Sequence, residues 1–241
     1  MKLKKVVKSL VNRTFDPWGM ELAYSHLVMH PKNDWLQNLR VQTILDIGAN
    51  KGQFAARIRE ILPEAFIYSF EPLRDAHEAL LSRMEGDNAF QTFNFALGDE
   101  NAKAVIHRSG YSQSSSLLPM LELHTEAWPH TAEAGTENVV VRRLDGLNLL
   151  LKPRIMVKID VQGFEDRVIA GGRVTIGGAT CVITEVSFQK LYDGQLLFDD
   201  IHFMLRDMGF QYSGNWDQLL DPRDGRPLQA DAIFINPDNA N

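Results

Sequence analysis

A short, largely apolar run that ends in a glycine-rich turn constrains the fold of this chain more than any other feature. Residues 43–47 read as a strand, the turn Gly48-Ala49-Asn50-Lys51-Gly52 follows, and apolar residues then recur at helical spacing as far as Leu62. Glycine lets the chain turn tightly and lets a ligand approach the backbone. A second apolar run, 65–70, ends at Glu71. This order of strand, turn, helix and strand predicts a parallel sheet with a ligand site at its strand ends.

The residues of the turn indicate which cofactor fits. A dinucleotide fingerprint spaces three glycines as G-x-G-x-x-G, so that a pyrophosphate lies at a helix N-terminus. Here the pattern has one glycine fewer, and Asp46 enters the turn. An aspartate repels a pyrophosphate but suits the amino group and sulfonium of S-adenosylmethionine. The motif therefore predicts a cofactor site made by Asp46, Gly48, Ala49, Asn50 and Gly52 at the methionine part, with Glu71 and Pro72 at the ribose.

Strands and helices alternate along the chain. The pattern predicts strands at 43–47, 66–70, 90–95, 139–142, 155–160 and 180–186, an extended stretch at 102–107, and helices at 2–12, 34–38, 52–62, 74–84, 164–170 and 198–208. Strands near 210–212 and 230–235, joined by the turn-rich segment 221–225, predict a terminal antiparallel hairpin. We expect an α/β fold with helices on both faces of a mostly parallel sheet. Residues 1–40 read as a helical extension and 41–241 as one domain.

With further motifs in the same order, the chain resembles the FkbM-type S-adenosylmethionine-dependent methyltransferases. The resemblance extends from about Thr43 to Asn236, and the K-I-D-x-x-G-x-E block is its most family-specific part. The matching residues are Asp46 to Gly52, Glu71-Pro72, Asn94-Phe95-Ala96-Leu97, Ser114-Ser115-Ser116-Leu117, Leu144-Asp145, Lys158 to Glu165, Gly171 and Glu185.

The resemblance implies a Rossmann-like class I methyltransferase fold, with a seven-stranded sheet closed by the C-terminal hairpin. It implies O-methylation of a hydroxyl on a sugar, a glycan or a natural product, and we favour a sugar in a bacterial glycan or its precursor. It also places Asn94, Ala96 and Ser115 at the cofactor. One departure from the family pattern is Gln162, where many relatives carry glutamate.

Two carboxylates are expected in the crevice at the carboxyl ends of the strands. Asp160 ends one predicted strand and Glu185 ends another. Methyl transfer from a sulfonium needs an aligned acceptor oxygen and removal of its proton. Asp160 is therefore the first candidate for the base, and Lys158 is placed to tune it or to stabilise the developing alkoxide.

Other roles for these residues stay open. Asp160 and Glu185 could instead hold Mg²⁺ through oxygen ligands, but two carboxylates without a metal motif do not favour a metal. Lys158 and Glu165 could form a structural ion pair. The base could instead be a histidine in or beside the segment 109–138, namely His107, His124 or His130.

The segment 109–138 interrupts the alternation and is too long for a simple connector. It carries Ser112 and Ser114 to Ser116, followed by apolar residues and two histidines. It is either a flexible surface insertion or a lid over the substrate site.

Charge and composition narrow the partners. The net charge of −6 argues against a nucleic-acid partner, and no segment approaches the about 20 apolar residues of a membrane span. The single Cys181 suits a reducing compartment, so a cytoplasmic location is expected. The predicted helix 2–12 is basic and amphipathic. It either packs on the domain or lies on a membrane surface.

Two rival functions follow from the same residues. A nucleotide-dependent oxidoreductase is disfavoured by the missing glycine, and Gln162 is the one hint of a catalytically silent module that only binds the cofactor. The oligomeric state has no signature in the sequence.

Overall fold

The structure is a computed structural model that describes residues 34–240. The helix expected at 2–12 lies outside the described residues. Helix α2 (Asp34–Asn38) precedes the sheet, and Leu36–Asn241 forms one unit. Within residues 34–240, no helix has both the length and the apolar character needed to cross a membrane.

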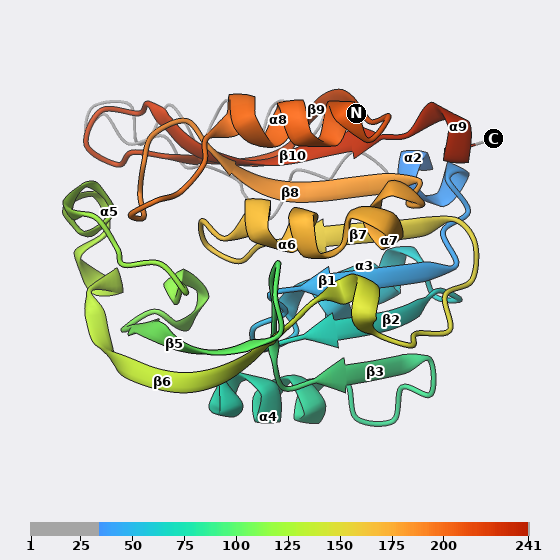
Figure 1. The fold of residues 1–241 in the computed structure, drawn as a ribbon, viewed down its shortest axis with the longest axis horizontal. Helices are drawn as coiled ribbons and strands as arrows, with labels where there is room; N and C mark the ends of the chain where they lie inside the picture. Colours follow the sequence, from blue (N-terminus) through green and yellow to red (C-terminus); the bar gives the residue numbers. More distant parts are fainter. Residues whose placement is uncertain (1–33, 241) are drawn as a thin grey trace, which may run out of the picture. The chain divides into compact units, whose positions relative to one another are not determined.

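Seven strands form the central sheet, in the order β3-β2-β1-β7-β8-β10-β9 (Figure 1). Strands β3, β2, β1, β7 and β8 run parallel, whereas β10 is antiparallel to both β8 and β9. The strands are β1 (Thr43–Ile47), β2 (Phe66–Phe70), β3 (Phe90–Phe93), β7 (Ile155–Ile159), β8 (Cys181–Ser187), β9 (Gln211–Leu220) and β10 (Pro227–Ile235). This confirms the predicted class I methyltransferase architecture and its terminal hairpin.

Helices cover both faces of this sheet, as a parallel sheet requires. On one face, Leu45, Ile47, Val157 and Ile159 join a core with side chains of α6 and α8. Figure 1 shows α6, α7 and α8 on the near side of the sheet. The other face carries Asp46 and Lys158, and Phe54 of α3 packs against Lys158 there. The helices are α3 (Gln53–Ile61), α4 (Arg74–Arg83), α6 (Glu165–Gly171), α7 (Arg173–Gly177), α8 (Phe198–Asp207) and the short α9 (Pro237–Ala240).

A second, three-stranded sheet was not predicted. Strands β4 (Ala96–Leu97), β5 (Ala102–Ser109) and β6 (Glu133–Arg142) form it, in the order β4-β6-β5. The stretches expected at 102–107 and 139–142 therefore belong outside the main alternation. The buried side chains of β5 and β6 include Ile106, Val139 and Val141, and Ile106 and Val139 pack on Leu73 and Ala76 at the start of α4.

The segment 109–138 is ordered into short elements. It contains η2 (Ser112–Ser114), α5 (Glu122–Ala127) and η3 (Pro129–Thr131), and its last residues begin β6. A further short turn, η4 (Leu144–Gly146), precedes β7.

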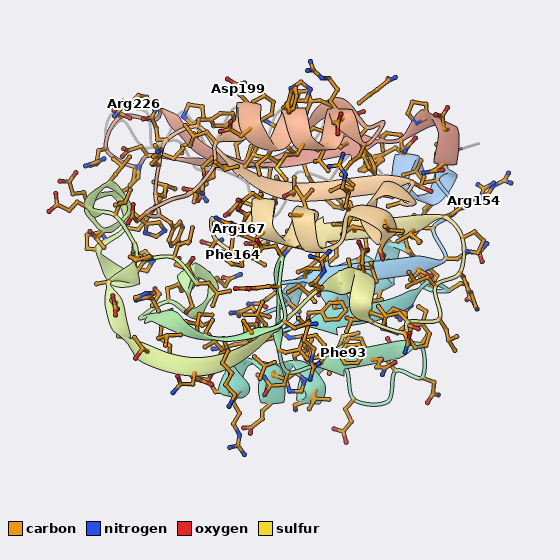
Figure 2. The ribbon with its side chains drawn as sticks, in the orientation of Figure 1. Phe93, Arg154, Phe164, Arg167, Asp199 and Arg226 are labelled. Atoms are coloured by element: carbon orange, nitrogen blue, oxygen red, sulfur yellow. The ribbon has the colours of Figure 1, made fainter. Side chains whose placement is uncertain are left out.

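Several strand boundaries differ from the prediction by one or more residues, and those of β3 and β9 have a clear physical setting. β3 ends at Phe93, whose ring stacks on Phe70 with centroids 5.2 Å apart, and Phe93 is labelled in Figure 2. β9 begins at Gln211 but continues to Leu220. This strand lies at the sheet edge and is largely exposed, so its sequence lacks the apolar pattern that marks a buried strand.

The turn after β1 touches the chain that follows β7. Gly48 has a φ of +79°, and a Cβ atom there would lie 1.8 Å from the carbonyl oxygen of Asp160. The backbone N–H of Asp160 donates to the carbonyl of Ile47 over 3.0 Å. Glycine is required at this position because protein backbone occupies the space, a constraint separate from the ligand approach expected from the sequence.

Gly48→Ala should therefore lower the free energy of unfolding by more than about 4 kcal/mol or prevent folding, because the clash adds to the strained φ. Gly86→Ala is the matched control, since Gly86 has a φ of +86° and no atom within 4 Å of the added Cβ. We expect it to cost about 1 to 2 kcal/mol. Urea denaturation measures both. Equal losses in the two variants would contradict the close approach at Gly48.

Candidate functional site

The carboxyl ends of β1, β2 and β7 surround a cavity of about 280 Å³. It lies at the strand ends, where open α/β sheets bind ligands. Nine of the residues predicted from the sequence line this one cavity. They are Gly48, Ala49, Asn50, Glu71, Pro72, Ala96, Ser115, Lys158 and Asp160.

Four predicted residues lie close by but do not line the cavity. Asp46 is fully buried beneath the turn, where the Ser69 hydroxyl donates to it over 3.1 Å. Gly52 packs against Leu80 of α4. The Asn94 amide donates to the carbonyls of Glu71 and Pro72, 2.9 Å away in each case, and so fixes the chain after β2. Glu185, the fourth, belongs to the network around Gln162 described below.

The Glu71 carboxylate is held rigidly at the end of β2. Its two oxygens accept from the backbone N–H groups of Asn50 and Leu73, each over 2.8 Å. Burial raises the pKa of Glu71 to about 7, although both hydrogen bonds act in the opposite direction. Each carboxylate oxygen can accept a further bond, so Glu71 can still bind a pair of hydroxyls.

Lys158 pairs with Asp160. The Lys158 ammonium donates to the Asp160 carboxylate over 2.9 Å and lies 5.5 Å from the centre of the Phe54 ring. Burial by itself would lower the pKa of Lys158, but Asp160 and Asp46 together outweigh it and raise that pKa. The alternative of an ion pair between Lys158 and Glu165 is not formed; Glu165 instead accepts from the N–H groups of Val161 and Gly163 (3.1 and 3.2 Å).

Gln162 connects the two expected crevice carboxylates. Its amide nitrogen donates to Asp160 over 2.7 Å and to Glu185 over 3.0 Å, and its amide oxygen accepts from the Tyr192 hydroxyl over 2.8 Å. Burial raises the pKa of Glu185 well above its usual value, and nearby Asp160 adds to the effect. An amide supplies donors to both carboxylates, whereas a glutamate here would supply a single donor, and only when protonated.

The segment 109–138 forms one wall of the site. Ser112, Gln113 and Ser115 to Leu117 line the cavity. The Ser116 hydroxyl donates to the carbonyl of Gln162 over 2.6 Å, and the Tyr192 hydroxyl oxygen lies 3.1 Å from the carbonyl oxygen of Ser114. The wall is thus bonded to the loop that carries Asp160.

None of the three histidines considered as a base lines the cavity. His107 faces Glu133 on β6, and the exposed His130 contacts Tyr111. His124 is buried between Thr131 and Tyr192, and burial lowers its pKa to about 4. Within residues 34–240, no three His, Cys, Asp or Glu side chains are grouped so as to hold a metal ion.

Sequence reasoning missed several lining residues, among them Phe54, Arg57, Ile106 and Asp231. Phe54 and Arg57 are three positions apart on α3, so they share the helix face above the strand ends. Asp231 lies opposite Glu185 on the neighbouring strand. Its position follows only from pairing the terminal hairpin with β8, which needs the three-dimensional topology.

Comparison with known proteins places these residues in a family. The model of the methyltransferase FkbM domain matches residues 46–212, more than half of the chain. The 2-O-methyltransferase NoeI of Sinorhizobium fredii (strain NBRC 101917 / NGR234) is 32% identical over 186 residues, which cover 74% of this chain and 76% of that protein.

A solved structure shares the fold. The crystal structure of methyltransferase FkbM from Methylobacillus flagellatus KT matches with a TM-score of 0.50 and 14% identity. The match covers 89% of this chain but 46% of the other, so this chain spans less than half the length of that protein.

Buried Glu165 should make stability depend on pH. Burial raises its pKa to about 7 from a usual value of 4.5, so ionising it costs more in the folded protein. The contribution of Glu165 to the free energy of unfolding is fully present below pH 4.5 and is lost as the pH rises through 7. Glu165→Gln keeps an oxygen for both N–H donors, and should flatten the decline in unfolding free energy between pH 4.5 and 7 by up to about 3 kcal/mol.

Chemical denaturation at a series of pH values measures this difference. Glu60→Gln, at an exposed position on α3, is the control and should follow the wild-type curve. Parallel curves for wild type and Glu165→Gln would show that Glu165 does not carry the effect.

Proposed function

Because the chain belongs to the FkbM family of S-adenosylmethionine-dependent methyltransferases, we propose that it methylates a hydroxyl group of a sugar or glycan, with the cofactor bound in the cavity at the strand ends. The observation that carries the proposal is the assembly of nine sequence-predicted residues around this one cavity. The relative NoeI, named as a 2-O-methyltransferase, supports oxygen as the methylated atom.

The residues of the cavity fit the cofactor. The buried Glu71 carboxylate is positioned to accept from the ribose hydroxyls, and the turn from Gly48 to Asn50 is positioned to line the methionine part. When bound, S-adenosylmethionine supplies an electrophilic methyl group. We assign Asn94 a supporting part, since it fixes the backbone of Glu71 and Pro72.

Asp160 is the proposed base. Its side chain is 30% exposed, lines the cavity and is oriented by Lys158 and Gln162. A carboxylate held in this way can align an acceptor hydroxyl and accept its proton. Lys158 keeps its charge beside that oxygen, where it favours a developing alkoxide. Glu185 does not line the cavity. It accepts a hydrogen bond from Gln162 and so helps to hold Gln162 in place beside Asp160.

The segment 109–138 is the proposed cover of the substrate site. Ser112 hydrogen-bonds Asn50 over 3.2 Å, so the wall meets the cofactor turn as well as the loop after β7. A wall fixed at both places would exclude water from the reacting groups.

Cofactor binding tests the first part of the proposal. Calorimetry with S-adenosylhomocysteine should show binding that Glu71→Ala weakens by about 1 to 3 kcal/mol, the cost of losing charge-assisted hydrogen bonds. Glu78→Ala, an exposed acid on α4, should bind as wild type does. Unchanged affinity in Glu71→Ala would remove Glu71 from the site, and preferential binding of NAD would contradict the function.

Turnover tests the role of Asp160. Asp160→Asn keeps the size and the hydrogen-bonding reach of the side chain. It should retain affinity for S-adenosylhomocysteine while methyl transfer to a hydroxylated acceptor falls by about 10²-fold or more. Chelation distinguishes a metal ligand from a base at Asp160. If Asp160 holds a metal, EDTA abolishes wild-type activity and Mg²⁺ restores it. Wild-type turnover in Asp160→Asn would exclude both roles.

A further inference from the structure

The cavity extends along the strand order of the sheet, past the residues assigned to the cofactor, as far as β10. Its lining includes Glu71 at the end of β2 and Asp231 on β10. Three strands, β1, β7 and β8, separate β2 from β10. At about 4.8 Å between neighbouring strands, these residues mark opposite ends of a site roughly 19 Å wide. With the ribose at Glu71 and the methionine part at β1, the end beyond β7 is left for the acceptor.

We propose that this end, lined by Phe54, Arg57 and Asp231, is the acceptor subsite and that it binds a neutral, hydroxyl-bearing ring such as a sugar. The inference rests on the proposed function and adds the residues that select the substrate.

Asp231 is a carboxylate placed for a ligand. It lies on the same sheet face as Lys158, since Lys158 and Ile233 both pair with Ile183. Its side chain makes no hydrogen bond or ion pair with another of the residues 34–240, although it is half-buried. Burial and the neighbouring Asp160 raise the pKa of Asp231 to about 6, so it is mostly ionised at neutral pH. An enclosed carboxylate of this kind gains from an outside donor.

Arg57 faces the same space from α3. Its guanidinium lies 5.2 Å from the centre of the Trp216 ring, and Phe54 meets Trp216 edge-on at 6.5 Å. No carboxylate among the residues 34–240 lies within ion-pair distance of Arg57. Trp216 of β9 thereby supports an arginine and an aromatic ring that both line the cavity.

The balance of charge indicates the kind of ligand. Asp160 and Asp231 carry negative charge, and Lys158 and Arg57 carry positive charge. A charged ligand would meet repulsion from one of these pairs, whereas hydroxyls can donate to the carboxylates and accept from the guanidinium. An apolar ring without hydroxyls would leave Asp231 desolvated and unpaired. Phe54 offers an apolar surface to the carbon side of a ring.

Saturation-transfer NMR tests the proposed acceptor subsite. The full chain is studied with enough S-adenosylhomocysteine to fill the cofactor site. The probes are the methyl glycosides of glucose, galactose, mannose and rhamnose, with glucuronic acid and glucosamine as charged counterparts. We expect at least one neutral glycoside to bind about tenfold or more tightly than either charged sugar. Asp231→Asn and Arg57→Gln, made separately, should each weaken that binding about tenfold or more. Affinity for S-adenosylhomocysteine should stay within about twofold of wild type.

Asp199→Asn is the matched control, because Asp199 is an exposed acid on α8 that does not line the cavity, and glycoside binding by this variant should be unchanged. The assignment is overturned when wild type binds S-adenosylhomocysteine but no neutral glycoside, or when both variants bind the glycoside as wild type does. Methyl transfer to a glycoside with the same KM in both variants would overturn the subsite alone and leave the proposed function standing. Failure to bind S-adenosylhomocysteine would instead overturn the function on which the subsite rests.

Discussion

The contact between Gly48 and the carbonyl group of Asp160 is the constraint on which the rest of the site depends. It joins the turn that approaches the cofactor to the loop that carries the proposed base, with no side chain between them. The hydrogen bond from the Asp160 N–H to Ile47 fixes the same pair from the other direction. The distance between the proposed cofactor turn and the proposed base is therefore set by backbone atoms, whose positions vary less than those of side chains.

A second constraint is the concentration of buried charge on one face of the sheet. Asp46, Lys158, Glu185 and Asp231 share this face; Asp46 and Lys158 are buried, and Glu185 and Asp231 are half-buried. Buried charges are tolerated when they are paired, and Asp231 is the exception among these four residues. Lys158 serves Asp160 directly and Asp46 through space, while the neutral Gln162 serves Asp160 and Glu185. Gln162 thus has a structural role in this chain.

Most of the central sheet could be predicted because its strands are buried runs separated by helical periodicity. The same pattern located Gly48, Glu71 and Asp160, since each follows a strand that the sequence marks clearly. Asp46 and Gly52 were assigned to the ligand from the motif alone, but one lies beneath the turn and the other against α4. The place of Asp231 in the cavity and the second sheet both depend on pairing between segments far apart in the sequence, which a local sequence pattern does not predict. The length of β9 was underestimated because most side chains of this edge strand are exposed to solvent, so its sequence lacks the alternation of apolar residues that marks a buried strand.

The position of β10 between β8 and β9 has a consequence for how the molecule is built during synthesis. The ribosome produces β9 before β10, yet β9 pairs with no other described strand. β9 therefore has no strand partner until β10 has been synthesised, and the pair can add to β8 only after that. The parallel strands and the Gly48 contact can assemble before that event. The wall of the cavity that contains Asp231 is then the last part of the site to form, so a chain stalled before β10 would hold a cofactor pocket open on one side.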